Sequence, residues 1–196
     1  MYRLGIDNER KLIIVTGLSG SGKSTLAKTL SECSGIEMFS LDTVKEKMFD
    51  NYGFLNSDER YILSETAKDV FKVELLVKAR KGNSVIIEYP FNTKWQDFFN
   101  LVKNQYNYTL VIINCVSRDF EAIWNAKVVR DKSKNRHLAH SAKRYIRNRI
   151  YEPDDSLYDD KYKYEEKRKL EECEYTSLKG DIEYTDKEIR EVVTLS

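Results

Sequence analysis

The stretch that decides the fold of this chain spans residues 11–25, and it reads Lys11-Leu12-Ile13-Ile14-Val15-Thr16-Gly17-Leu18-Ser19-Gly20-Ser21-Gly22-Lys23-Ser24-Thr25. Its first residues are largely β-branched and apolar, which predicts a short buried strand. The residues after Thr25 carry Leu26, Ala27 and Leu30 at helical spacing, which predicts a helix over residues 24–32. A glycine-rich turn therefore joins a strand to a helix.

This turn follows the pattern Gly-x-x-x-x-Gly-Lys-Ser, the phosphate-binding loop or Walker A motif. Backbone N–H groups of such a turn converge on phosphate oxygens, and the helix N-terminus adds partial positive charge. Lys23 is expected to reach the β- and γ-phosphates, Ser24 to offer its hydroxyl to Mg²⁺, and Thr25 to cap or line the helix start. We therefore predict that ATP or GTP binds with Mg²⁺ through Gly17, Ser19, Gly20, Ser21, Gly22, Lys23, Ser24 and Thr25.

Strand-like and helix-like segments alternate along the rest of the chain. Apolar runs predict further strands at residues 36–41, 84–88, 109–116 and 173–178. Helical spacing and capping signals predict helices over 43–49, 56–81, 93–104, 117–129 and 140–150, with a closing helix capped by Thr185 and Glu188. This order predicts an α/β P-loop NTPase sandwich of three layers, with about five parallel strands, helices on both faces and a helical lid.

Length and composition favour one ordered domain over residues 1–196, because 196 residues are enough to bury a core. The N-terminus lacks the apolar segment of a signal peptide, and no apolar run is long enough to cross a membrane. Cys33, Cys115 and Cys173 have no metal-ligand spacing, so we expect reduced thiols and a cytoplasmic protein. A charged, tyrosine-rich segment over about 152–172 is expected to form a surface helix.

Two carboxylates stand where such a sheet would place its chemistry, since Asp42 ends the second predicted strand and Glu88 ends the third. One could accept the proton of an attacking hydroxyl, and the other could hold Mg²⁺ through water; we assign the metal role to Glu88. The alternative is that each carboxylate caps a helix or pairs with a lysine. Tyr89, next to Glu88, could line a substrate pocket or pack in the core.

A basic segment follows the fourth predicted strand. Residues 127–149 hold nine Lys or Arg and one acidic residue, a charge of +8, which leaves −7 for the rest of a chain with a net charge of +1. We predict a lid over residues 118–150 in which Arg130 and Arg136 stabilise the charge of a transferring phosphoryl group. Both histidines, His137 and His140, lie in this segment, and a phosphate contact, a substrate contact and a structural role remain open for them.

With these features the chain resembles the small P-loop kinases, a group that includes gluconate kinase, adenylylsulfate kinase, polynucleotide 5′-kinases and zeta-toxin-like phosphotransferases. Its later part resembles bacterial AAA-type ATP-binding proteins of this group. Members often carry Asp-x-x-Arg after the second strand, where the resemblance implies that the Asp is the base and the Arg contacts substrate. Asp42 and Lys45 match these positions, and Lys45 departs from the pattern because lysine cannot make a bidentate fork.

Three functions follow from these observations. The first is a kinase that transfers the γ-phosphate of ATP to a hydroxyl of a small molecule or nucleotide. The second, supported by the basic segment, is a polynucleotide 5′-hydroxyl kinase, although a nucleic-acid footprint should exceed one lid. The third is a nucleotide-dependent switch without an acceptor. ATP is expected because the resembling kinases use it. The sequence alone predicts no oligomeric state.

Overall fold

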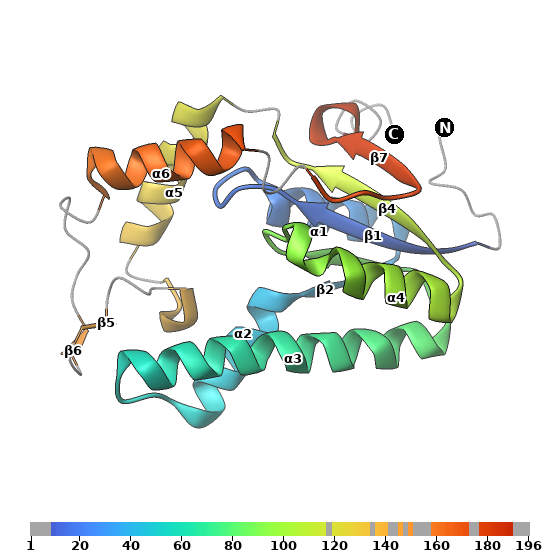
Figure 1. Cartoon of the computed structure of the whole chain (residues 1–196), viewed down its shortest axis with the longest axis horizontal. Coiled ribbons are helices and arrows are strands. Elements are labelled where there is room, and N and C mark those ends of the chain that lie inside the picture. Colours follow the sequence, from blue (N-terminus) through green and yellow to red (C-terminus); the bar gives the residue numbers. More distant parts are fainter. Residues whose placement is uncertain are drawn as a thin grey trace.

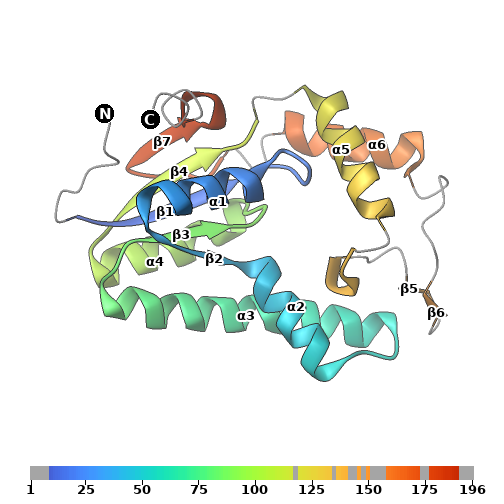
Figure 2. The ribbon, with the colours of Figure 1, turned by 180° about the vertical axis from the view of Figure 1, so that it is seen from behind.

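The computed structural model describes residues 9–116, 119–133, 136–140, 145–146, 149–150, 158–172 and 177–189. A parallel sheet of five strands in the order β2-β3-β1-β4-β7 forms its centre, with helices on both faces (Figures 1 and 2). The strands are β1 (Arg10–Thr16), β2 (Glu37–Ser40), β3 (Val85–Glu88), β4 (Tyr108–Asn114) and β7 (Ile182–Thr185). The predicted fold class, a three-layer α/β sandwich of the P-loop type, is confirmed.

The described α-helices follow the predicted alternation with the strands. They are α1 (Lys23–Ser34), α2 (Leu41–Tyr52), α3 (Ser57–Lys81), α4 (Gln96–Tyr106), α5 (Phe120–Lys132) and α6 (Asp160–Glu171). Two short 3₁₀ helices, η1 (Thr93–Trp95) and η2 (Leu138–His140), complete the list together with residues 186–189, which are helical. In the described part of the chain, no helix combines the length and apolar character that a membrane span requires.

Two apolar cores cover the two faces of the sheet. Alternate residues of β1 face opposite sides, so Leu12 and Ile14 belong to one core and Ile13 and Val15 to the other. The first core packs under α3 and α4, and the second packs under α1. Figure 2 shows α1 on the face opposite α3 and α4. This double burial explains why β1 is a nearly continuous apolar run.

The ends of several helices agree with their capping signals. The Asn56 side chain accepts a hydrogen bond from Glu59 N at 2.9 Å, and Gly82 ends α3 in the left-handed conformation, as the sequence predicts. The predicted capping box of Thr185 and Glu188 also forms, with Glu188 Oε2 accepting from Thr185 N at 2.6 Å. At α4 the prediction is wrong: Asn92 caps η1, while Gln96 instead hydrogen-bonds to Lys179.

Two predicted elements are corrected. The predicted basic helix over 140–150 is wrong, because residues 145–146 and 149–150 form a two-stranded antiparallel pair, β5 (Tyr145–Ile146) and β6 (Arg149–Ile150). Like charges three or four residues apart, such as Lys143 and Arg147, oppose a helix there. The last strand is β7 rather than 173–178: residues 177–180 form no strand, and 173–176 lie outside the described residues.

The lid elements gather at one end of the sheet. Figure 1 shows α5, α6 and η2 beyond the carboxyl end of β1, on the side where the glycine-rich turn also lies. This is the end of a parallel α/β sheet at which ligands bind.

Candidate active site

The phosphate-binding loop connects β1 to α1 and packs very closely against the backbone of neighbouring segments. A Cβ atom on Gly17 would lie 2.6 Å from the carbonyl oxygen of Cys115, and one on Gly20 would lie 2.6 Å from the carbonyl oxygen of Ile123. Both glycines also have positive φ angles, which side chains rarely tolerate. The end of β4 and helix α5 therefore shape the loop together.

Lys23 lies inside this loop, at the start of α1. Its side chain is buried, with 5% of the residue exposed, and Nζ donates a hydrogen bond to the carbonyl of Leu18 at 2.8 Å. Burial lowers the pKa of Lys23, and the carboxylate of Glu88 opposes that shift. A buried ammonium of this kind is suited to an anionic ligand, which would supply the charge that water no longer supplies.

Three polar atoms around the loop fit a phosphate group. Ser21 Oγ, Arg130 Nε and Arg136 Nε are buried and have no hydrogen-bond partner. Unpaired buried donors are costly, so a ligand that accepts hydrogen bonds would stabilise all three. The residues present therefore fit the phosphates of a nucleotide at the N-terminus of α1.

Glu88, at the end of β3, lies on the same side of the site as Ser24. Its carboxylate is 3% exposed and accepts hydrogen bonds from the hydroxyls of Ser40, at 3.3 Å, and Ser24. Burial raises the pKa of Glu88, while Lys23 lowers it. Among the residues described, no group of three or more His, Cys, Asp or Glu could hold a metal ion. A Mg²⁺ ion here would therefore draw on Ser24, Glu88, water and the nucleotide.

Asp42 lies in the first turn of α2 rather than at the end of a strand. Ser40 caps this helix, because its hydroxyl accepts a hydrogen bond from Asp42 N at 3.1 Å. The Asp42 side chain is 37% exposed, unlike the buried Glu88. Its charge acts on Lys23 and also on Lys45. The charge of Asp42 therefore acts both on the phosphate-binding loop and on the next turn of α2.

Lys45, one turn further along α2, is buried beside Tyr89. Its ammonium donates a hydrogen bond to the Tyr89 hydroxyl at 2.7 Å and lies 4.8 Å from the centre of the ring. Burial lowers the pKa of Lys45 to about 8, against the opposing effect of Asp42. Tyr89 thus has a charged hydrogen-bond partner, although it also packs against Phe91. The residues Arg60, Glu65 and Lys68 of α3 act electrostatically on the same ammonium.

The two predicted arginines both reach the loop side of the site. Arg130, in the last turn of α5, donates a hydrogen bond to the hydroxyl of Ser19. Arg136 Nε lies 3.5 Å from Asp131 Oδ1, and Asp131 also lies 3.9 Å from Arg130 Nε. Burial and the charge of Arg130 lower the pKa of Arg136. The arginines are therefore close neighbours that share one carboxylate, an arrangement suited to an additional anion.

Other predicted residues have simpler surroundings. Thr25 is exposed on the first turn of α1, and the N-cap position belongs to Gly22. Arg144 and Arg147, which we consider surface charges or substrate contacts, lie outside the described residues.

Some residues of the site are not evident from the sequence. Ser40 has a local signal, since it stands just before the start of α2, and serine is a strong helix-capping residue. Arg60 lies far from the motifs but donates a hydrogen bond to the carbonyl of Ala139 at 2.8 Å. His140 contacts Asp42 and Glu46 across 98 and 94 residues of sequence, respectively. Contacts over such separations leave no local pattern that could reveal them.

The charged segment after residue 152 is more than a solvated helix. Within α6, Glu166 is buried and pairs with Lys127 of α5 at 2.8 Å, and Tyr162 also contacts Lys127. Trp124 packs against Tyr158 and Tyr162. Helix α6 therefore packs directly on the helix that carries Arg130.

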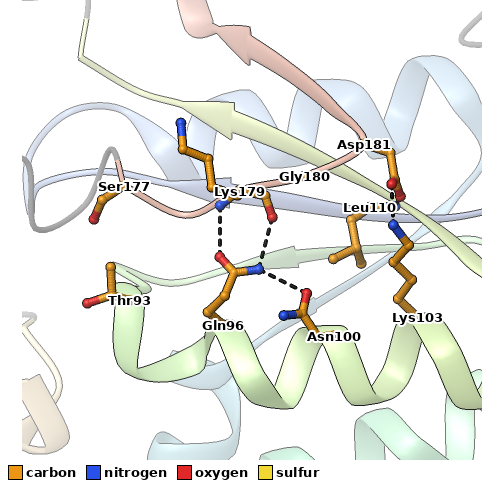
Figure 3. A pocket seen from close by; sticks show the side chains of 9 residues that line it. All are labelled: Thr93, Gln96, Asn100, Lys103, Leu110, Ser177, Lys179, Gly180 and Asp181. Atoms are coloured by element: carbon orange, nitrogen blue, oxygen red, sulfur yellow. Dashed lines mark hydrogen bonds and ion pairs between the residues drawn. The ribbon is translucent and has the colours of Figure 1, made fainter.

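A cavity of about 420 Å³ lies elsewhere, between α4 and the segment that leads into β7. Figure 3 shows Gln96 joined to the backbone of Lys179, and Lys103 directed at Asp181. Its lining includes Leu110, near the amino end of β4, whereas the phosphate-binding loop contacts Cys115 beyond the carboxyl end. This cavity therefore lies apart from the phosphate-binding loop and is not the nucleotide site. Its hydrogen bonds hold the segment that leads into the edge strand β7 against α4.

Comparison with known proteins agrees with this fold. A family model described as an AAA domain (AAA_33) matches residues 12–149. A proposed kinase from Chloroflexus aurantiacus superposes with a TM-score of 0.68 at 20% identity, over 95% of this chain and 96% of that chain. The shikimate kinase of Acinetobacter baumannii, solved with shikimate, gives 0.51 at 12% identity, over 95% of each chain.

A chain of the PezAT chromosomal toxin–antitoxin system from Streptococcus pneumoniae gives a TM-score of 0.52 at 16% identity, over 84% of this chain and 64% of that chain. No curated protein matches the sequence significantly. At these identities the structural likeness concerns the fold, and the acceptor must be argued from the site itself.

Proposed function

Since this chain belongs to the AAA_33 family of AAA domains and has the fold of small P-loop kinases, we propose that it is an ATP-dependent kinase. It transfers the γ-phosphate to a hydroxyl group of a small molecule or nucleotide. The observation that carries the proposal is the surroundings of Lys23: its ammonium is buried in the phosphate-binding loop, Arg130 is hydrogen-bonded to Ser19 of the same loop, and the charge of Asp42 also acts on Lys23. We assign the arginine side to the phosphate donor and the Asp42 side to the acceptor.

On the phosphate side, the loop amides and Lys23 bind the β- and γ-phosphates. Arg130 and Arg136 neutralise the charge that spreads over the transferring group. Ser24 and Glu88 would hold Mg²⁺, which would offset the negative charge of the phosphates. The buried Nε atoms of the two arginines lie within 4 Å of Asp131 but form no hydrogen bond in the described part of the chain, which supports this assignment because a phosphate could accept from both.

On the acceptor side, Asp42 accepts the proton of the attacking hydroxyl, while Lys45 and Tyr89 line the pocket. Asp42 is the better candidate base because it is partly exposed, whereas Glu88 is buried against Ser24 and Lys23 on the phosphate side. Glu88 is therefore assigned to the metal and Asp42 to the acceptor.

A small acceptor is favoured over a polynucleotide. The described side chains of the basic segment turn toward partners within the chain: Lys127 toward Glu166, Lys132 toward Tyr158, and Arg136 toward Asp131. Within the described residues, such paired charges give little of the open basic surface that nucleic-acid backbones require. A nucleotide-dependent switch without an acceptor would need no base. The presence of Asp42 as a candidate base therefore also argues against that function.

The test is Mg²⁺-dependent turnover of ATP by the purified protein against a panel of hydroxyl compounds. The panel holds sugars, sugar acids, nucleosides, nucleotides, aminoglycosides and 5′-hydroxyl oligonucleotides. We expect one small-molecule class to stimulate turnover, and the Lys23→Ala and Asp42→Asn variants to lose that stimulation. Stimulation by oligonucleotides alone would favour the polynucleotide kinase. ATP binding with no stimulation by any acceptor would contradict a kinase for these substrates and favour the switch.

A further inference from the structure

The segment 136–140 joins the phosphate side of the site to the acceptor side. Arg136 lies at its start and is within electrostatic range of Arg130. His137 Nε2 contacts Asp50 of α2 at 2.9 Å, and Arg60 of α3 donates a hydrogen bond to the Ala139 carbonyl. Ala139 itself is buried. The segment is therefore seated on both α2 and α3 while it carries an arginine toward the phosphates.

His140 is the residue of this segment that reaches the candidate base. Its side chain is 8% exposed, Nε2 lies 2.8 Å from Glu46 Oε1, and Nδ1 lies 3.6 Å from Asp42 Oδ1. The first distance is a hydrogen bond, and the second is too long for one but is a close electrostatic contact. A buried imidazole therefore lies between two carboxylates of the same helix.

The ionisation of His140 follows from the groups around it. Burial lowers its pKa, Arg136 lowers it further, and Asp42 and Glu46 of α2 oppose the shift. From α3, Arg60 is engaged with the neighbouring carbonyl of Ala139. Burial is the largest of these effects and favours the neutral imidazole, whose hydrogen bond to the Glu46 carboxylate requires the proton on Nε2. Nδ1 then presents a lone pair to Asp42.

We propose that His140 is a positioning residue for the acceptor site, which accepts a hydrogen bond from Asp42 once that group has taken a proton. The inference rests on the proposed kinase function. During transfer, the acceptor hydroxyl gives its proton to Asp42 as its oxygen bonds to the γ-phosphorus and the bond to the β-phosphate oxygen breaks. Protonated Asp42 then donates to His140 Nδ1, and the proton leaves to solvent as the product departs.

The contact between His140 and Asp42 is tested first without any activity measurement. The chain has two histidines, so each imidazole can be titrated separately by NMR. Because the charge of Asp42 raises the pKa of His140, the Asp42→Asn variant should lower that pKa further. An unchanged His140 titration in this variant would overturn the inference whatever the enzyme does.

The second arm is kinetic and uses His137 as a matched control. With the acceptor found in the panel, His140→Gln should lower kcat by about tenfold or more with little change in KM for ATP, whereas His137→Gln should retain kcat. Adding His140→Gln to Asp42→Asn should cause little further loss, because the histidine acts through the carboxylate. Additive losses, or equal losses in both histidine variants of unchanged thermal stability, would contradict the proposal. Absence of any kinase activity would overturn the proposed function instead, while the titration still decides the contact.

Discussion

At the scale of single residues, the site is built from charges that burial keeps away from water. Lys23, Lys45 and Glu88 all lose most of their exposure, and burial shifts the pKa of each toward the neutral form. Such groups reduce the stability of the fold, because desolvation costs more than their present contacts return. A group of such buried, ionisable residues in one place is typical of sites that bind charged ligands.

Lys45 offers a direct test of this balance. At pH 7 the ammonium is charged in both states but buried only in the folded one, so Lys45→Met should raise the free energy of unfolding by about 1–3 kcal/mol. The same change should reduce acceptor-stimulated turnover. Lys47→Met, on an exposed position of the same helix, is the control for both denaturant unfolding and turnover. A less stable Lys45→Met variant would mean that the bond to Tyr89 outweighs the desolvation.

His140 makes the stability of the chain dependent on pH. Its pKa is lowered in the folded state, so between that value and about 6.5 the unfolded state binds more protons. The stability that depends on neutral His140 is therefore fully present above about pH 6.5. It is lost as the pH falls through the pKa of His140 in the folded state. Unfolding in urea from pH 7.5 to 5.5 should show a weaker pH dependence for His140→Gln than for the wild type. Equal slopes for the two proteins would contradict the prediction.

At the scale of elements, the position of Arg130 depends on a contact between two helices far apart in sequence. Helix α5 touches the phosphate-binding loop at Gly20, and α6 holds α5 from the other side. Burial alone would raise the pKa of Glu166, but hydrogen bonds and charges from Lys127 and Lys169 outweigh it, so the pKa is lowered. The buried pair of Glu166 and Lys127 is therefore well formed.

Removing one partner of that pair should be costly. Glu166→Gln leaves the Lys127 ammonium without its counter-charge, so the free energy of unfolding should fall by about 3 kcal/mol. Because α5 carries Arg130, the affinity for ATP should also fall. The control is Glu165→Gln, which changes an exposed neighbour and should affect neither quantity. Calorimetric unfolding measures the stability, and ATP titration measures the affinity. Wild-type stability of the Glu166→Gln protein would contradict a stabilising role for the buried pair of Glu166 and Lys127.

At the scale of the whole molecule, one end of the sheet collects groups from segments spread along the chain. The loop after β1, the end of β3, the start of α2, helix α5 and the segment 136–140 all contribute. Figure 1 shows these elements around one end, while the cavity of Figure 3 runs along α4 beside the segment that leads into β7. A nucleotide at that end of the sheet would bind several separate elements at once and should stabilise them together.

Nucleotide binding should therefore raise the stability of the entire domain. At 100 to 1,000 times its Kd, a ligand of the folded state adds about 2.7–4.1 kcal/mol, so Mg²⁺-ATP should shift Tm upward by several degrees. Lys23→Ala should abolish most of this shift in a thermal melt. A shift that persists in the variant would place the nucleotide elsewhere, and the polar cavity beside Gln96 would be the next place to examine.

Much of the architecture could be predicted from local patterns. The run before Gly17, the glycine-rich turn and the capping signals at Asn56 and Gly82 each involve residues within one turn or strand of each other. The predictions of secondary structure were wrong where local sequence signals were weak, or where several neighbouring residues could serve as the helix cap. Thr93 and Gln96 have the spacing of a capping box, but the nearby Asn92 caps η1 instead. Gln96 accepts a hydrogen bond from the backbone of Lys179. The basic stretch after His140 had helical spacing but a repulsive charge pattern.

By itself, the sequence determined the phosphate-binding loop, the parallel α/β fold and the candidate residues Lys23, Asp42, Glu88, Arg130 and Arg136, because backbone preferences and apolar periodicity act over short distances. Only the tertiary structure decided which distant groups meet. It seated His140 between Asp42 and Glu46, paired Lys127 with Glu166, and gave Lys45 its contact with Tyr89. These contacts arise when separate elements pack against one sheet, and their shifted pKa values exist only after that packing removes water.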